Sequence, residues 1–170
     1  MDNRDANRQA AAKDSAALPF DESVGYQVRQ AHRLIQRHLQ QEIEPYGVTP
    51  GMWYFLRALW HQDGLTQREL SLVVGTMEPT TLTAINSMER NGLVRRVKNS
   101  DDRRKINIFL TRRGKALRAE LMPLAKEVVN DAVAGLSPQE RSMFLGYLKT
   151  VQDNLLARIE GNAQPAETAK

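Results

Sequence analysis

Basic side chains are concentrated in one stretch of this 170-residue chain, and their chemistry indicates the kind of partner it contacts. Residues 90–118 hold eleven lysines and arginines against two aspartates, a formal charge of +9. The whole chain carries +4, which leaves −5 for the remainder. Positive charge concentrated in this way is expected where a protein contacts a polyphosphate. A solvated basic face without a partner is the alternative interpretation.

A second group of residues has the chemistry to bind a small molecule. Trp53, Arg57 and Trp60 follow each other at the spacing of one helix face. Two indoles beside a guanidinium suit a planar aromatic acid, through ring stacking and charge-assisted hydrogen bonds. His61 and His32 could hydrogen-bond the same ligand; the alternative for each is a structural role. The alternative is that both tryptophans belong to the core, with Arg57 in an ion pair or packed on a ring.

Other chemistry has no candidate residues in this sequence. His32 and His38 are six residues apart, so on a helix they point about 120° apart and cannot share a metal by themselves. We find no nucleophile–base arrangement, Gly-rich phosphate loop or carboxylate pair that indicates catalysis. We therefore expect no metal, no cofactor and no enzymatic activity.

The composition limits where the protein works. Hydrophobic residues make up 41% of the chain, and no apolar run approaches the roughly 20 residues of a membrane span. There is no cysteine, which excludes disulfides and thiolate zinc sites. The first 17 residues lack an apolar signal core. We expect a cytoplasmic protein without a membrane partner, with poorly ordered tails at 1–20 and 161–170.

The elements that must position these residues are mainly helical. Apolar residues recur at the spacing of one helix face from residue 21 to 45. Thr49 and Pro50 are typical of the start of a second helix. Thr66 and Glu69 form a capping box that opens a short third helix, and Gly75 makes the turn after it. Two further helices are predicted after Thr111 and after the capping box Ser137–Glu140.

A helix is also predicted from about Pro79 to Arg90, and it completes a helix-turn-helix with the short helix before it. We expect Leu82, Ile85 and Met88 to face inward. The outward, candidate DNA-binding residues of this helix are then Thr80, Thr81, Thr83, Ala84 and Ser87. With threonine, serine and alanine on that face, base reading would rest on short hydroxyl contacts and on packing against thymine methyl groups.

A β-hairpin wing is predicted directly after this helix. Gly92 can provide the left-handed residue that ends the helix. Ile106, Ile108 and Leu110 alternate with polar or aromatic residues, which is the period of a strand with one buried face. A polar tip containing Arg103 and Arg104 separates the two strands.

Four motifs in order resemble the MarR family of bacterial winged helix-turn-helix transcriptional regulators, over about residues 24–159. They are Gly64-Leu65-Thr66-Gln67-Arg68-Glu69-Leu70, Met88-Glu89-Arg90-Asn91-Gly92-Leu93-Val94, Asp101-Asp102-Arg103-Arg104 and Leu110-Thr111-Arg112-Arg113-Gly114. The resemblance implies a mainly α fold, with a winged helix-turn-helix lobe at 49–110 flanked by dimerisation helices at 21–45 and 111–160. Together they form a single domain at 21–160.

The resemblance also implies what this fold does. It implies a homodimer on double-stranded DNA, with a wing arginine in the minor groove that an aspartate such as Asp102 holds by an ion pair. A small ligand would bind between the dimer interface and the DNA-reading lobe. We therefore expect a repressor that an aromatic or heteroaromatic carboxylate releases from a palindromic operator. The alternative is a winged-helix module for protein–protein assembly or non-specific DNA coating, which the basic segment fits equally well.

Overall fold

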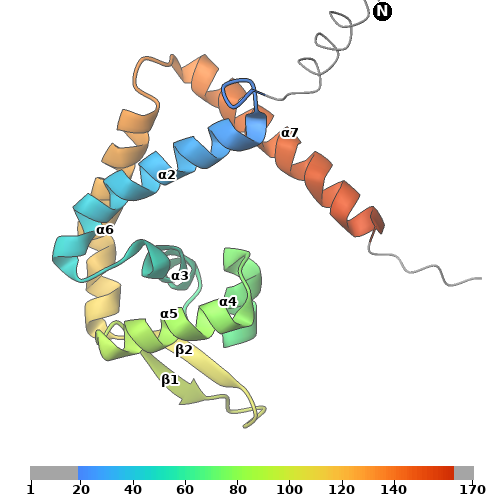
Figure 1. The fold of residues 1–170 in the computed structure, drawn as a ribbon. Helices are drawn as coiled ribbons and strands as arrows, with labels where there is room; N and C mark the ends of the chain where they lie inside the picture. The colour runs from blue at the N-terminus through green and yellow to red at the C-terminus, as the bar shows by residue number, and fades with distance from the viewer. Residues whose placement is uncertain (1–18, 163–170) are drawn as a thin grey trace, which may run out of the picture. The chain divides into compact units, whose positions relative to one another are not determined.

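The structure, a computed structural model, describes residues 19–162 (Figure 1). The predicted tails at 1–20 and 161–170 lie almost wholly outside the described residues. The chain divides into two compact units, the first ending at Val129 and the second beginning at Asn130. Each unit is described by itself.

The described elements are mainly helices with one β-hairpin, which confirms the predicted fold class. In chain order they are α2 (Val24–Ile43), the 3-10 turn η1 (Glu44–Tyr46), α3 (Pro50–His61), α4 (Gln67–Val74), α5 (Glu78–Arg90), β1 (Val94–Lys98), β2 (Ile106–Leu110), α6 (Arg112–Ala132) and α7 (Pro138–Asn162).

Local hydrogen bonds explain where several helices begin. The predicted capping box of α4 is present, because Glu69 N donates to Thr66 Oγ1 while Thr66 N donates to a Glu69 carboxylate oxygen. These bonds lower the pKa of Glu69, first through the Thr66 backbone N–H and then through its hydroxyl. Thr111 caps α6 by accepting from Gly114 N. Thr49 precedes α3, but its side chain makes no capping bond, which corrects the prediction for that residue.

The wing is an antiparallel pair of strands. Val94 pairs with Leu110 at one end of β1 and β2, and Lys98 pairs with Ile106 at the other. A bridge between Thr66 and Asn107 joins the loop before α4 to the same ribbon. Of the three residues predicted to face inward on β2, Ile108 and Leu110 are buried, whereas Ile106 remains 43% exposed next to the hairpin loop.

One hydrophobic core joins the elements of the first unit. Leu39 and Ile43 of α2, the inner face of α3, Leu70 of α4 and Ile85 of α5 all belong to it. Both strands contribute to the core, and α6 adds Leu117, Leu121 and Val128. The helix-turn-helix and the wing are therefore packed on α3 and α6 as one body.

The inward face of α5 differs from the prediction. Thr81 and Ala84 were expected outward but are buried, and Leu82 was expected inward but is 42% exposed. The buried row is Thr81, Ala84, Ile85 and Met88, which has the i, i+3, i+4, i+7 spacing of one helix face. Thr81 is tolerated there because its hydroxyl accepts from Ser71 Oγ at 2.9 Å and donates to Met77 O at 3.2 Å.

The second unit contains the end of α6 and the long helix α7. The predicted capping box at its start is present, with Glu140 N donating to Ser137 Oγ and Ser137 N donating to Glu140 Oε2 at 2.7 Å. None of the helices within residues 19–162 is long and apolar enough to cross a membrane.

A close approach fixes α6 to the wing. A Cβ atom added at Gly114 would lie 2.1 Å from the Leu93 carbonyl oxygen and 3.1 Å from a Leu110 methyl carbon. Thr111 N also donates to that Leu93 oxygen at 3.0 Å. Only glycine therefore allows the first turn of α6 to lie this near the entry to β1.

We predict that Gly114→Ala lowers the free energy of unfolding by about 1–3 kcal/mol or more, because backbone must move to admit the methyl group. Gly51→Ala is the matched control: its Cβ would meet only Thr49 Oγ1 at 3.8 Å, and stability should hold or rise slightly. Urea denaturation followed by circular dichroism, at one protomer concentration, measures both. Equal stabilities for the two variants would show that the contact does not constrain the fold.

Candidate nucleic-acid interface and ligand cavity

The exposed face of α5 is the first part of the candidate DNA interface. Thr80 and Thr83 are exposed and Ser87 is half-buried, so these three residues remain candidates. Thr81 and Ala84 are inside the lobe and are removed from the predicted contact set. The row opposite the buried face contains Pro79, Thr83, Asn86 and Arg90, each of which is exposed.

Sequence reasoning therefore missed Asn86 and Arg90 as outward residues of this helix. The signal was present in the sequence, because Thr81, Ala84, Ile85 and Met88 have a helical spacing that leaves both residues on the opposite side. This spacing was overlooked because Thr81 was assumed to face solvent. The hydrogen bond between Thr81 and Ser71 makes the buried position acceptable.

The wing tip holds its arginine in a defined arrangement. Arg104 Nε donates to Asp102 Oδ1 at 3.0 Å, and Arg104 Nη2 donates to Asp102 Oδ2 at 3.2 Å. The Arg104 backbone N–H adds a third bond to the same carboxylate. These bonds lower the pKa of Asp102, the side chain of Arg104 contributing most. The ion pair implied by the family resemblance is thus present on one of the two wing arginines.

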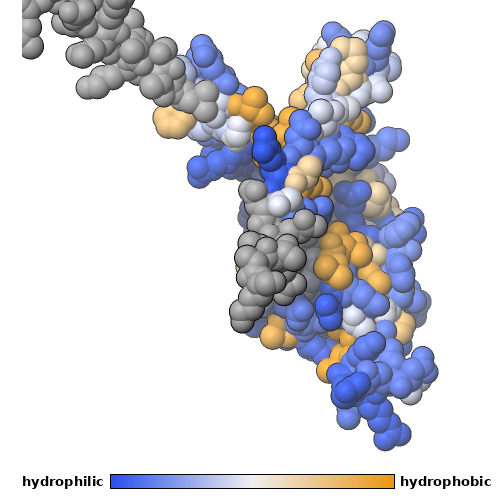
Figure 2. All heavy atoms as spheres, turned by 90° about the vertical axis from the view of Figure 1, so that its right-hand side faces the viewer, coloured by the Kyte–Doolittle hydropathy of each residue, from blue (hydrophilic) through white to orange (hydrophobic). Residues whose placement is uncertain are grey.

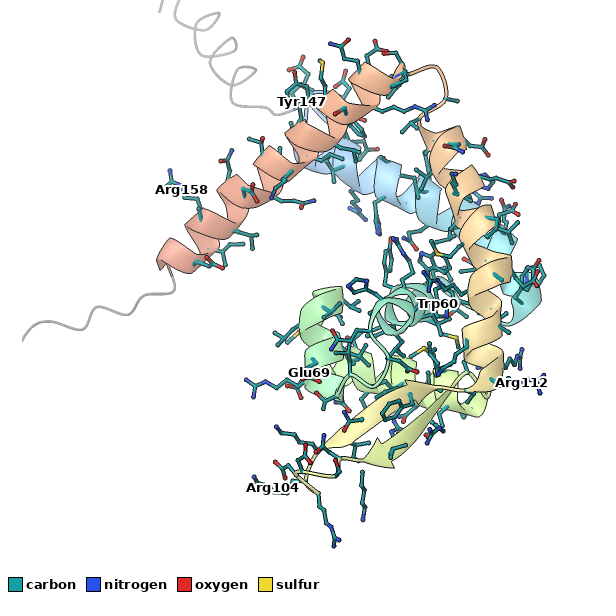
Figure 3. All side chains as sticks on the ribbon, turned by 180° about the vertical axis from the view of Figure 1, so that it is seen from behind. Trp60, Glu69, Arg104, Arg112, Tyr147 and Arg158 are labelled. Carbon is teal, nitrogen blue, oxygen red and sulfur yellow. The ribbon has the colours of Figure 1, made fainter. Side chains whose placement is uncertain are left out.

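The Arg104 side chain remains 90% exposed although Asp102 holds it. Figure 3 shows Arg104 at the tip of the hairpin, pointing away from the core. Figure 2 shows that the corresponding lower end of the molecule is hydrophilic. Arg103 is also exposed beside it. The tip therefore presents positive charge to a partner while one guanidinium is kept in place.

Two asparagines tie this tip to the loop between α3 and α4. Asn99 Oδ1 accepts from the backbone N–H groups of Asp101 and Asp102, both at 2.9 Å. Asn99 Nδ2 donates to Asn107 Oδ1 at 2.9 Å, and Asn107 Nδ2 donates to Gly64 O at 2.6 Å. The hairpin loop is therefore connected to the body of the lobe by a continuous series of amide hydrogen bonds.

The candidate ligand residues on α3 lie together. The rings of Trp53 and Trp60 meet edge to face, with centroids 5.7 Å apart. The guanidinium carbon of Arg57 lies 5.9 Å from the Trp53 ring centroid. Trp53 is buried in the core, and Trp60 Nε1 donates to Gly114 O at 2.8 Å. Figure 3 shows Trp60 between α3 and α6. The core interpretation therefore holds for the Trp53 ring, which carries Arg57 on its face.

A cavity of about 570 Å³ adjoins this group in the first unit. Its lining is mostly apolar, and its two charged residues, Arg57 and Lys126, are both cationic. The lining residues are Ile35, Leu39, Trp53, Tyr54, Arg57, Met122, Pro123, Ala125, Lys126, Val128 and Val129. An apolar chamber with cations and no carboxylate has the chemistry to hold an aromatic anion. Lys126 was not predicted as a ligand residue.

The five predicted ligand residues do not share this one chamber. Trp60 and His61 line a smaller hollow of about 300 Å³ with Arg57, Arg118 and Met122. His32 lines an open cleft of about 750 Å³ between α2 and the start of α3, next to three arginines of α2. Of the five predicted residues, Arg57 alone lines both hollows beside α6, where Met122 also lines both. No cluster of histidines and carboxylates that could hold a metal occurs within residues 19–162.

This geometry defines a winged helix-turn-helix protein, a class that reads DNA with the second helix of the motif. Known proteins with similar sequences belong to the same class. Residues 48–106 match the family described as MarR family. The transcriptional regulator TtmR of Methylorubrum extorquens is 26% identical over 150 residues, which cover 88% of this chain and 76% of TtmR.

Solved structures are also similar. A structure of Bordetella bronchiseptica BpsR, concerned with regulation of its DNA binding by 6-hydroxynicotinic acid, has a TM-score of 0.74 and 27% identity, covering 79% of this chain and 96% of its own. The S. aureus MepR–DNA complex has a TM-score of 0.73 and 25% identity, covering 78% and 98%. Over its winged helix-turn-helix lobe the chain matches the MarR family, and the proteins to which it is similar are DNA-binding transcriptional regulators.

We predict that Arg104→Ala weakens binding to a duplex selected by the wild-type protein by about 1–3 kcal/mol, the range for one specific groove contact. Arg104→Lys keeps the charge but cannot bridge both Asp102 oxygens, so it should recover only part of the loss. Fluorescence anisotropy measures the affinity, and circular dichroism checks the fold, which should not change. Wild-type affinity in Arg104→Ala would contradict the role of the wing.

Proposed function

We propose that this protein is a repressor that binds a palindromic operator as a homodimer and is released from it by a planar aromatic or heteroaromatic carboxylate. The observation that carries the ligand part is the apolar cavity next to α3 and α6, whose only charged lining residues are the cations Arg57 and Lys126. The exposed face of α5 and the wing tip carry the DNA part.

The DNA part follows from helix-turn-helix geometry. In this class the second helix enters the major groove, and a dimer reads two half-sites about one helical turn apart. Here that helix is α5. The wing then reaches the flanking minor groove, where a narrow, A·T-rich sequence attracts an arginine such as Arg104. The candidate contacts are Thr80, Thr83 and Ser87 on α5, with Arg103, Arg104 and Asp102 on the wing.

Exposed apolar side chains support the dimer. Within the second unit, α7 leaves Phe144, Leu145 and Tyr147 between 45% and 66% exposed, and Leu155, Leu156 and Ile159 between 53% and 65%. A row of this kind favours burial against another surface, because each large apolar side chain gains about 1.5–3 kcal/mol when it is fully buried. A second copy of the chain is the proposed partner.

The ligand part rests on the chemistry of the cavity. The Arg57 and Lys126 side chains suit a carboxylate, while Trp53 and the aliphatic lining suit a flat ring. The similarity to BpsR supports the same class of effector, since 6-hydroxynicotinic acid is a heteroaromatic carboxylate. His61 and Trp60 lie in the adjoining hollow beyond Arg57, and His32 lies in a separate cleft.

Contacts at the end of α3 provide a route from the cavity to the DNA-reading parts. Asp63, just beyond α3, accepts from Leu110 N at 2.8 Å and pairs with Lys115 Nζ at 3.1 Å. A ligand that displaces α3 relative to α6 would therefore also move the base of the wing. Its effect on DNA binding can be no larger than the difference between its affinities for the two states.

We predict that binding to a selected palindromic duplex falls steeply with salt, because the basic segment is present twice in a dimer and releases counterions from several phosphates. Each neutralised phosphate should contribute about 0.9 to the slope of log affinity against log salt concentration. Anisotropy titrations at several salt concentrations, with analytical ultracentrifugation for stoichiometry, measure this. A scrambled duplex is the control. Equal affinity for both duplexes would favour the non-specific coating module.

We predict that 6-hydroxynicotinate or benzoate quenches the fluorescence of the chain's two tryptophans and releases the protein from DNA. Benzamide, the uncharged analogue of benzoate, should do neither. Arg57→Ala should leave DNA binding near its wild-type value but weaken release by the carboxylate.

Arg29→Ala is the charge-matched comparison for that ligand test, because Arg29 lines the separate cleft that holds His32. Release should stay normal in this variant. Loss of release in Arg29→Ala, with normal release in Arg57→Ala, would contradict the proposed cavity and favour the His32 cleft.

A further inference from the structure

Asn86 occupies the centre of the outward face of α5. It lies seven residues after Pro79, three after Thr83 and four before Arg90, so these exposed residues share one side of the helix. That side is opposite the buried row of Thr81 and Ile85. When α5 lies in a major groove, the Asn86 amide is therefore placed to reach base edges.

An arginine of the wing holds the Asn86 amide in one orientation. Arg96 Nη2, from β1, donates to Asn86 Oδ1 at 2.6 Å. Arg96 Nη1 also donates to Glu89 Oε2, so an ion pair keeps the guanidinium in place. A guanidinium has donors and no acceptor, so the amide atom that faces it must be the oxygen. The usual ambiguity between the oxygen and nitrogen of an asparagine does not arise here.

The consequence is an amide whose Nδ2 donors are available while its oxygen already accepts from a cation. Asn86 Nδ2 makes no hydrogen bond with any part of the chain from residue 19 to 162. Its oxygen, which an asparagine needs in order to accept from the N6 amino group of adenine, already accepts from the Arg96 guanidinium with one of its two lone pairs, and this adjacent cation disfavours a second donor there. Guanine presents two neighbouring acceptors in the major groove, O6 and N7, and no donor at that edge.

We propose that Asn86 is a specificity-determining residue that reads a guanine in each half-site, and that Arg96 is the positioning residue that sets this choice. Glu89 completes the arrangement by holding Arg96. The proposal rests on the proposed function in one respect, which is the entry of α5 into the major groove. Beyond that function, the proposal assigns a base preference to Asn86 and names the Arg96 contact that determines this preference.

The first experiment isolates the role of Asn86. Duplexes are selected from a random library by the wild-type protein, and affinities are then measured for the selected duplex and for each single base-pair change. Asn86→Ala should lower the preference for guanine at one position of each half-site by about 5- to 150-fold. Preferences at the other positions should be unchanged.

The second experiment tests the positioning role of Arg96. Arg96→Ala removes the cation that engages the Asn86 oxygen, so preference at the same position should move from guanine toward adenine. Arg95→Ala is the matched control, because it removes the same charge from the neighbouring residue of β1, whose guanidinium lies over the Phe109 ring. This control should weaken binding to all duplexes alike and leave the base preference unchanged.

Three outcomes would overturn the inference. An unchanged preference profile in Asn86→Ala removes Asn86 as a determinant, while the proposed repressor function would stand. If Arg96→Ala has the same base preferences as Arg95→Ala, Arg96 does not position Asn86. A wild-type protein that selects no sequence overturns both the inference and the operator proposal. Circular dichroism of each variant checks that the fold is intact, as expected for exposed or half-buried positions.

Discussion

The contact between the first turn of α6 and the backbone that enters β1 is the constraint on which the first unit depends. Gly114 allows it, because any larger residue would overlap the Leu93 carbonyl oxygen. In the same turn, the Gly114 carbonyl oxygen accepts from the indole N–H of Trp60 on α3. The backbone N–H and the hydroxyl of Thr111 both donate to the Leu93 carbonyl oxygen. Helix, hairpin and long helix are therefore joined within a few residues.

The same contact lies between the candidate ligand cavity and the wing, and bonded residues connect the two. The cavity residues Trp53 and Arg57 lie on α3, and the last turn of that helix leads to Asp63, which bonds both β2 and α6. The amide series from Gly64 through Asn107 to Asn99 then extends to the hairpin loop. Hydrogen bonds therefore connect the end of α3 to the hairpin loop that carries Arg104.

Much of the fold was predictable from the sequence because its signals are local. Capping boxes, a helix-ending glycine and alternation in β2 depend on neighbouring residues, and they located the elements correctly. The inward face of α5 was predicted wrongly because Thr81 is buried only through a partner on another helix, Ser71. The division of the ligand residues among three hollows depends in the same way on α2 and α6, which periodicity along α3 cannot reveal.

The separation of faces on α5 has a consequence for how such a regulator can diverge. Thr81, Ala84, Ile85 and Met88 hold the helix in the lobe, and no member of this set belongs to the outward row. Substitutions at Pro79, Thr83, Asn86 or Arg90 therefore leave the buried contacts intact. After a gene duplication, the two copies could acquire different target sites through changes in that row alone, without first accumulating mutations that compensate for lost stability.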